Sequence, residues 1–193
     1  IANGGIQTHP EHGRKKLNLA TMQPNLAYMS LQSGQIDDTF ELANKHLSIR
    51  HLDVSSSGKV VAGLQYQGRP NDEVPLAISH HGEAQLSALN AEQSTWRSMK
   101  HYTSSVCINS DNNTVAITCP RANLVTYWQL NSGDFMASYK IKDGAGVTLI
   151  DEHFIVSTGR GRIVSQQEPM QGYSIRGDFE YLQWDNHMNA ISA

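Results

Sequence analysis

The chain has 193 residues, of which 39% are hydrophobic and 17% charged, and its formal net charge is −3. This composition is typical of a folded globular domain that can bury one sizeable core. There is no excess of basic residues and no apolar run of membrane-spanning length, which argues against a nucleic-acid partner and against a membrane span. Two cysteines are too few for a disulfide scaffold.

The first residues, Ile-Ala-Asn-Gly-Gly, resemble the end of a β-strand and not a targeting leader. We therefore expect the sequence to be a fragment or a processed piece of a longer protein. The first unit then predicts strands at 1–6, 26–31 and 35–42. The long loop at 7–25 carries His, Arg, Asn and Met, and loops of such length are commonly functional.

The second unit predicts four short strands around turn and loop residues. They lie at 47–54, 59–66, 75–80 and 83–89. Asn90 then offers a helix N-cap, with Gln93 three residues further on. We expect one short helix at 91–100 and no other.

The third unit is the most regular one. Its first hairpin joins 105–108 to 114–119 through Asp-Asn-Asn, and its second joins 124–130 to 135–141 through Asn-Ser-Gly. The fourth unit predicts strands at 146–150, 154–158 and 162–166, with an outer strand at 181–191.

The turn before the outermost strand recurs with a period of about fifty residues, as Ser33-Gly34, His81-Gly82 and Ser132-Gly133. Four short antiparallel strands in each period are typical of β-propeller blades. We therefore predict an all-β repeat protein, a partial β-propeller of the YVTN/WD40-like type with about four four-stranded blades in one domain. The approximate blades are 1–43, 44–92, 93–142 and 143–193. Four blades leave exposed sheet edges, so we expect either further blades upstream or self-association.

Several motifs along the whole chain resemble one known family. They are Ala-Asn-Gly-Gly-Ile-Gln-Thr-His-Pro at 2–10, Gly13-Arg14, Leu-Asn-Leu at 17–19, Ser-Ile-Arg-His-Leu at 48–52, Gln-Tyr-Gln-Gly at 65–68, Cys-Pro-Arg at 119–121 and Trp-Asp-Asn-His at 184–187. They resemble a bacterial family of propeller-like proteins, domain of unknown function 1513 (DUF1513). The resemblance implies the C-terminal half of a longer periplasmic protein with a twin-arginine leader. It also implies a genetic link to imelysin-type proteins of iron uptake.

Basic residues are concentrated in the expected connections between second and third strands and at the entry to an innermost strand. In a propeller these connections emerge on one face around the central channel. Arginine guanidinium groups there would attract carboxylate or phosphate. The alternative is that they are ordinary exposed residues or inter-blade ion pairs. The candidate ligand-binding residues are His9, Arg14, Arg50, His51, Arg69, Arg121, Arg160 and Arg162.

Nine histidines raise the possibility of a transition-metal cofactor. The pair His9-x-x-His12, together with His51 and His187, could supply imidazoles for iron, copper or zinc. No carboxylate pair or thiolate at ligand spacing completes this set. The alternative is that each histidine is a surface or hydrogen-bonded structural residue.

The cysteines, Cys107 and Cys119, lie symmetrically about Asn113 in the first hairpin of the third unit. They could face one another and form a cross-strand disulfide in an oxidising compartment. The favoured alternative is two buried small hydrophobic residues, because directly opposed strand positions suit a disulfide poorly.

These observations lead to three functional hypotheses. The first is a non-enzymatic periplasmic binding module, linked to iron uptake by resemblance, that holds an anionic small molecule or a protein partner. The second is a metal-assisted hydrolase or lactonase, with His9, His51 and His187 near the metal. The third is a structural scaffold. The sequence has neither a Gly-x-Ser-x-Gly nor a Gly-x-x-x-x-Gly-Lys motif, and we assign no catalytic residue.

Overall fold

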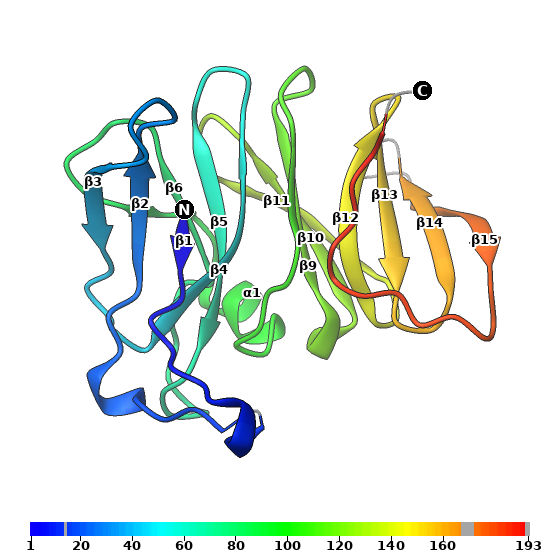
Figure 1. Ribbon diagram of the computed structural model, residues 1–193. Helices are drawn as coiled ribbons and strands as arrows, with labels where there is room; N and C mark the ends of the chain where they lie inside the picture. Colours follow the sequence, from blue (N-terminus) through cyan, green and yellow to red (C-terminus); the bar gives the residue numbers. More distant parts are fainter. Residues whose placement is uncertain (14, 167–171, 192–193) are drawn as a thin grey trace.

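The computed structural model describes residues 1–13, 15–166 and 172–191. These residues form four antiparallel sheets that stand side by side in an arc (Figure 1). Within each sheet, neighbouring strands are also neighbours in sequence. This is the arrangement of propeller blades, and it confirms the predicted all-β fold class.

The first sheet has three strands and the second has four. The first contains β1 (Ala2–Asn3), β2 (Asn25–Met29) and β3 (Ile36–Glu41). The second contains β4 (Leu47–Val54), β5 (Val60–Tyr66), β6 (Ala77–His80) and β7 (Ser87–Ala88).

The third and fourth sheets have four strands each. The third contains β8 (Val106–Asn109), β9 (Thr114–Cys119), β10 (Leu124–Gln129) and β11 (Phe135–Lys140). The fourth contains β12 (Gly144–Ile150), β13 (His153–Thr158), β14 (Arg162–Gln166) and β15 (Ser174–Asp178).

One α-helix, α1 (Gln93–Ser98), connects the second sheet to the third. The predicted N-cap was wrong: Glu92 occupies the cap position and makes no side-chain cap hydrogen bond. Asn90 instead forms a parallel bridge with Asp134, and its Nδ2 donates to Oδ1 of Asp134 at 2.8 Å. Tertiary pairing therefore overrides the local capping signal. Within the described ranges, no helix is both long and apolar enough to cross a lipid bilayer.

The predicted outer strand at 181–191 was also wrong. The outer strand is β15, which pairs with β14 from Arg162 opposite Asp178 to Ser165 opposite Ser174. The chain then turns where Phe179 N donates to Gly161 O at 3.0 Å. Residues 179–191, called the C-terminal segment below, run back across the arc in front of β12 (Figure 1).

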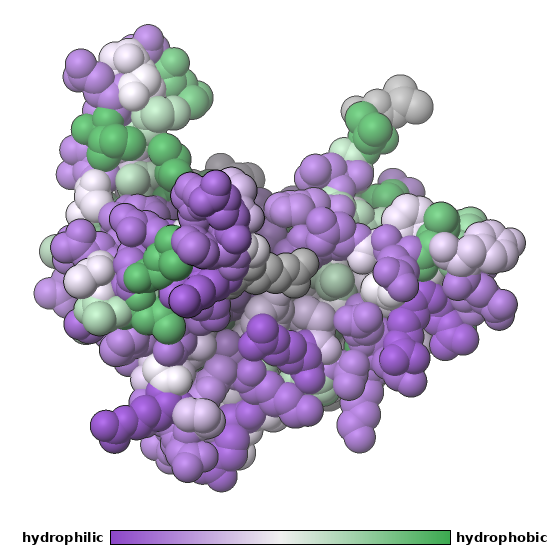
Figure 2. All heavy atoms as spheres, turned by 60° about the horizontal axis from the view of Figure 1, so that its bottom comes forward, coloured by the Kyte–Doolittle hydropathy of each residue, from purple (hydrophilic) through white to green (hydrophobic). Residues whose placement is uncertain are grey.

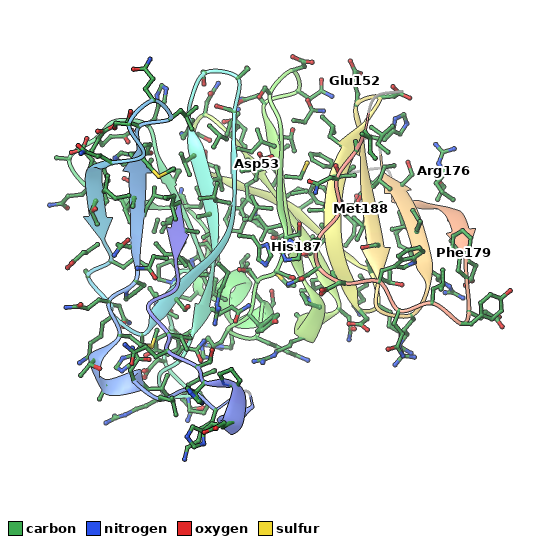
Figure 3. The ribbon with its side chains drawn as sticks, in the orientation of Figure 1. Asp53, Glu152, Arg176, Phe179, His187 and Met188 are labelled. Atoms are coloured by element: carbon green, nitrogen blue, oxygen red, sulfur yellow. The ribbon has the colours of Figure 1, made fainter. Side chains whose placement is uncertain are left out.

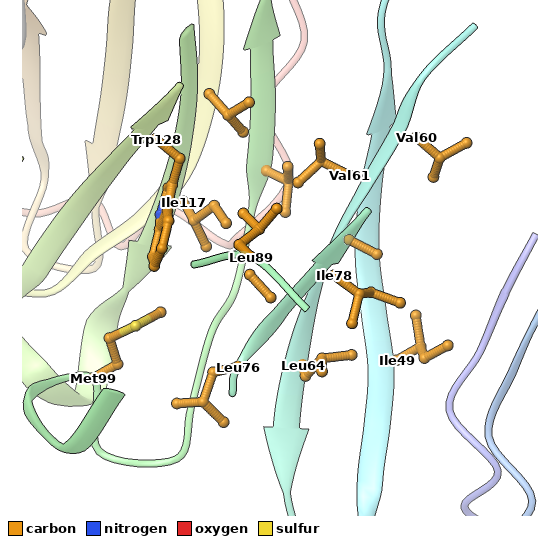
Figure 4. Packing of buried hydrophobic residues seen from close by; sticks show 14 of the residues in the cluster. Ile49, Val60, Val61, Leu64, Leu76, Ile78, Leu89, Met99, Ile117 and Trp128 are labelled. Atoms are coloured by element: carbon orange, nitrogen blue, oxygen red, sulfur yellow. The ribbon is translucent and has the colours of Figure 1, made fainter. Parts of the chain in front are cut away.

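Two apolar clusters hold the sheets together. The larger one extends from Leu26 of the first sheet through the second sheet to the third, and it includes Leu64, Met99 and Trp128 (Figure 4). Trp96 from α1 stacks on Trp128, with ring centroids 4.9 Å apart. The smaller cluster lies on the other face of the third sheet and includes Tyr127 and residues of the fourth sheet. Strand alternation explains this division, because neighbouring residues such as Tyr127 and Trp128 face opposite sides.

The cysteines follow the same alternation. Cys107 lies opposite Ala116 and belongs to the smaller cluster, whereas Cys119 lies opposite Leu124 and belongs to the larger one. Both are free and buried. They occupy opposite faces of the third sheet, so the possible cross-strand pairing was wrong and the buried hydrophobic alternative holds.

Candidate anion-binding site

The connections that follow β1, β5, β9 and β13 lie at one end of the sheets. They include the long loop after β1 with its 3₁₀ helix Pro10–His12, and the 3₁₀ helix Pro120–Ala122 between β9 and β10. They form the lower end in Figure 1, and Figure 2 turns this end forward to show that its side chains are largely hydrophilic.

Arg50 and His51 lie on a β-bulge of β4. Ile49 pairs with Leu64 and Leu52 pairs with Ala62, so Arg50 and His51 together stand opposite the single residue Gly63. A bulge of this kind breaks the alternation of side chains and redirects them. The sheet therefore presents two consecutive basic side chains at one point.

The innermost strands of the other two four-stranded sheets are irregular at the same place. Thr118 hydrogen bonds to both Ser104 and Ser105 before β8, and the register of β12 shifts between Gly144 and Val147. Small residues occupy these positions. The innermost strands of all three four-stranded sheets are therefore irregular at this end, and only in the second sheet do the irregular positions carry basic side chains.

Arg50 is half-buried, and its Nε atom is buried without a hydrogen-bond partner among the described residues. Burial lowers the pKa of Arg50 from its ordinary value, and the nearby Tyr102 opposes this effect. Within the described part of the chain, no carboxylate forms an ion pair with Arg50. A partly desolvated guanidinium with free donors favours a negatively charged partner.

Two further cations lie close to Arg50. The guanidinium of Arg121, from the β9–β10 connection, lies over the Tyr102 ring at 4.0 Å from its centroid, and Lys16 Nζ donates to Gln67 Oε1. Burial lowers the pKa of Lys16, and the positive charges of Arg121 and Arg50 lower it further. Lys16 is therefore near enough to both arginines for their charges to repel it. We call Lys16, Arg50 and Arg121 the cationic cluster.

The long loop that carries Lys16 is fixed by hydrogen bonds. Asn18 Oδ1 accepts from Gln7 N at 2.7 Å, while Asn18 Nδ2 donates to Gly5 O at 2.9 Å. Lys45 Nζ donates to Ala20 O at 2.7 Å, which ties the loop to the segment before β4. The loop therefore has a defined structure that places Lys16 beside the second sheet.

His51 contacts the C-terminal segment. Asn186 Nδ2 lies 3.2 Å from His51 Nε2, and the rings of His51 and His187 are 4.9 Å apart. Burial lowers the pKa of His51, as do His187 and Arg50, whereas Asp185 raises it. Figure 3 shows His187 in the middle of the arc and Phe179 at its outer end, so the segment bridges distant sheets.

A cavity of about 260 Å³ lies beside this contact. Its walls come from β4, the entry to β8, β12 and the C-terminal segment, and they are mostly polar. The residues that line it are His51, Leu52, Asp53, Ser105, Val106, Cys107, Val147, Thr148, His187, Met188 and Asn189.

Three other candidate arginines of the described residues are not part of the cationic cluster. Arg69 is exposed in the β5–β6 loop. Arg160 and Arg162 line a separate cavity of about 300 Å³, where Arg162 Nε forms an ion pair with Asp178 Oδ2 at 2.9 Å. This pair matches the alternative interpretation of the basic residues as structural ion pairs. Arg14 lies outside the described residues.

The four candidate metal ligands form two pairs. His9 and His12 are exposed, with rings 5.7 Å apart, and the second pair is His51 and His187. Among the described residues, no group of three or more His, Cys, Asp or Glu side chains could hold a metal ion. The four candidate histidines thus lie in two separate pairs among the described residues, and metal binding by them stays a prediction.

Sequence reasoning missed three members of the site. Lys16 lies in the long loop and belongs to no recognisable motif, so only the unusual length of the loop indicated function there. Tyr102 and Gln67 have no local signal, because their roles come from contacts with residues far away in the chain.

Comparisons with known proteins support the fold. A family model described as "Protein of unknown function (DUF1513)" matches residues 1–191. Among solved structures, the WD40 repeats of RRP9 are similar, with a TM-score of 0.64 and 12% sequence identity over 84% of this chain and 49% of that one. The chain thus spans about half the length of that structure. No curated protein matches the sequence.

Proposed function

The chain belongs to the DUF1513 family, and we propose that it is a β-propeller binding module whose cationic cluster holds an anionic small molecule. The observation that carries this proposal is Arg50, a half-buried guanidinium with a buried, unpartnered Nε among the described residues. It lies beside Lys16, whose pKa both Arg50 and Arg121 lower.

Placing Lys16 beside two arginines is unfavourable in the absence of negative charge, because both repel it and Arg50 is partly desolvated. The chain as a whole has a net charge of −3, so this local excess does not follow from its composition. An oxyanion would offset the repulsion and accept a hydrogen bond from the Nε–H group of Arg50, which has no partner among the described residues. Guanidinium forks suit carboxylate and phosphate groups in particular.

Tyr102 contributes by positioning. Its ring supports the Arg121 guanidinium through a cation–π contact, which leaves the N–H edges of that group available to a ligand. A pre-oriented side chain loses less conformational freedom when a ligand binds.

Anion-dependent thermal stabilisation tests the proposal. Sulfate, phosphate and citrate should raise the melting temperature of the unaltered protein above that in chloride of equal ionic strength. Arg50→Ala together with Arg121→Ala should abolish this rise. Arg69→Ala together with Arg160→Ala is the matched control, because it removes the same charge outside the cluster. Equal melting in all four salts would refute the proposal.

The periplasmic location and the link to iron uptake stay predictions that rest on family resemblance. Fractionation of cells that produce the full-length protein would test the location.

A further inference from the structure

We infer that the ligand is longer than a single oxyanion: its anionic head contacts the cationic cluster, and a second group with acceptor oxygens enters the cavity beside His51 and His187. This inference rests on the proposed function and specifies the class of ligand as an extended anion.

The cluster and the cavity are joined at one bulge. Arg50 belongs to the cluster and His51 lines the cavity, and they are consecutive residues opposite Gly63. The charge of Arg50 also acts on the His51 ring and lowers its pKa. A ligand that contacts Arg50 therefore lies near the cavity, because the next residue, His51, lines it.

The two histidines that line the cavity carry ring nitrogens that can donate hydrogen bonds. The Asn186 amide nitrogen can only donate, so His51 Nε2 accepts and the proton of the neutral ring is on Nδ1. Among the described residues, His51 Nδ1 has no hydrogen-bond partner, and the same holds for both ring nitrogens of His187. Donors without partners favour a ligand group rich in acceptors.

Among the lining residues one is acidic, Asp53, and its two carboxylate oxygens each accept a backbone hydrogen bond. Asp53 Oδ2 accepts from Ile108 N at 2.7 Å, and its Oδ1 accepts from Val54 N at 2.8 Å. These bonds hold the carboxylate in place without removing its charge, which raises the pKa of Cys107 in the same wall. A second anionic group must therefore enter on the side of His51 and His187. Ser105, Thr148 and Asn189 add further polar groups to the lining.

The wall formed by the C-terminal segment fits closely against glycines of the fourth sheet. A Cβ added to Gly146 would lie 3.1 Å from Cβ of Met188 and 3.3 Å from Asp185 O, and one added to Gly161 would overlap Phe179 O at 2.0 Å. The C-terminal segment can lie this close to the fourth sheet because Gly146 and Gly161 have no side chain. The cavity volume of about 260 Å³ is enough for a phosphoryl or carboxylate group and too small for most drug-sized ligands.

Titration calorimetry with inorganic phosphate and pyrophosphate tests this inference. Pyrophosphate should bind the unaltered protein about tenfold or more tightly than phosphate, because the second phosphoryl group enters the cavity without a separate association cost. His51→Ala together with His187→Ala should reduce this ratio about fivefold or more and leave phosphate binding within about twofold. The exposed pair His9→Ala and His12→Ala is the matched control and should leave the ratio unchanged.

The unaltered protein provides a second measurement that does not depend on the folding of a variant. Pyrophosphate, and not phosphate, should shift the ring proton signals of His187 in NMR spectra. An unchanged ratio in the His51/His187 variant, or equal His187 shifts with both anions, would overturn the inference while the anion site itself stands. If neither anion binds the unaltered protein, the proposed function fails as well.

Discussion

Gly63 and Thr103 meet without room for a further atom: a Cβ added to Gly63 would lie 2.5 Å from Oγ1 of Thr103. Thr103 is fixed there, because its Oγ1 donates to Leu64 O at 2.9 Å and its carbonyl accepts from Gln65 Nε2 at 3.0 Å. Gly63 is also the residue opposite the Arg50–His51 bulge. The residue that pairs with the Arg50–His51 bulge is therefore also the residue through which the second sheet contacts Thr103.

Gly63→Ala should destabilise the protein by about 1–3 kcal/mol, because the added methyl group overpacks a buried contact. Urea unfolding measures this loss. Thr103→Ala removes the nearest atom, so the double variant should lose less stability than the sum of the two single variants. Strict additivity would contradict the proposed contact.

Much of the fold could be predicted from local signals. β4 runs over Leu47–Val54 as expected, and the hairpin of β8 and β9 follows from two β-rich runs around an Asp-Asn-Asn turn. The outer strand of the fourth sheet could not be predicted in this way. An outer strand was expected at 181–191, but these residues run back across the fourth sheet and β15 takes the edge.

The candidate site was predicted only in part. Arg50, His51 and Arg121 were assigned to one face by topology alone, since loops of the same type emerge at the same end of a propeller. That rule does not give distances. It could not separate Arg121, stacked on Tyr102, from Arg162, which pairs with Asp178. Such differences depend on neighbours that are distant in sequence.

Arg50→Gln should stabilise the protein in low-salt buffer by up to about 0.5 kcal/mol, because it removes a partly desolvated charge that repels Lys16, an effect that solvent screening keeps small. The same variant should lose the stabilisation by sulfate. Melting curves with and without sulfate measure both effects. Arg69→Gln, on an exposed loop outside the cluster, should change neither. Destabilisation by Arg50→Gln in the absence of anions would indicate a structural role for this side chain.

His51 should make the protein less stable as the pH falls. Its pKa is lowered in the folded state from the ordinary value of 6.5, so below pH 6.5 the unfolded chain binds more protons at this residue. The free energy of unfolding then decreases as the pH falls from 6.5 through the lowered pKa, and this contribution is absent above that window. Urea unfolding at pH 7.5 and 5.5 should show a smaller decrease for His51→Gln than for the parent. The exposed His12→Gln serves as the control, and equal pH dependence in all three proteins would contradict the prediction.

Both cysteines should be inert in the folded protein. Burial raises the pKa of Cys107 to about 12 and that of Cys119 to about 12, so at pH 8 only about one thiol in ten thousand is ionised. They also lie on opposite faces of the third sheet, which prevents a bond between them. We therefore expect iodoacetamide to label neither residue in native buffer and both in denaturant. Mass spectrometry under non-reducing conditions should show two free thiols. Rapid native-state labelling of the fully buried Cys119 would show that its cluster is open to solvent, and rapid labelling of Cys107, which lines the cavity beside His51, would show that burial does not suppress its ionisation.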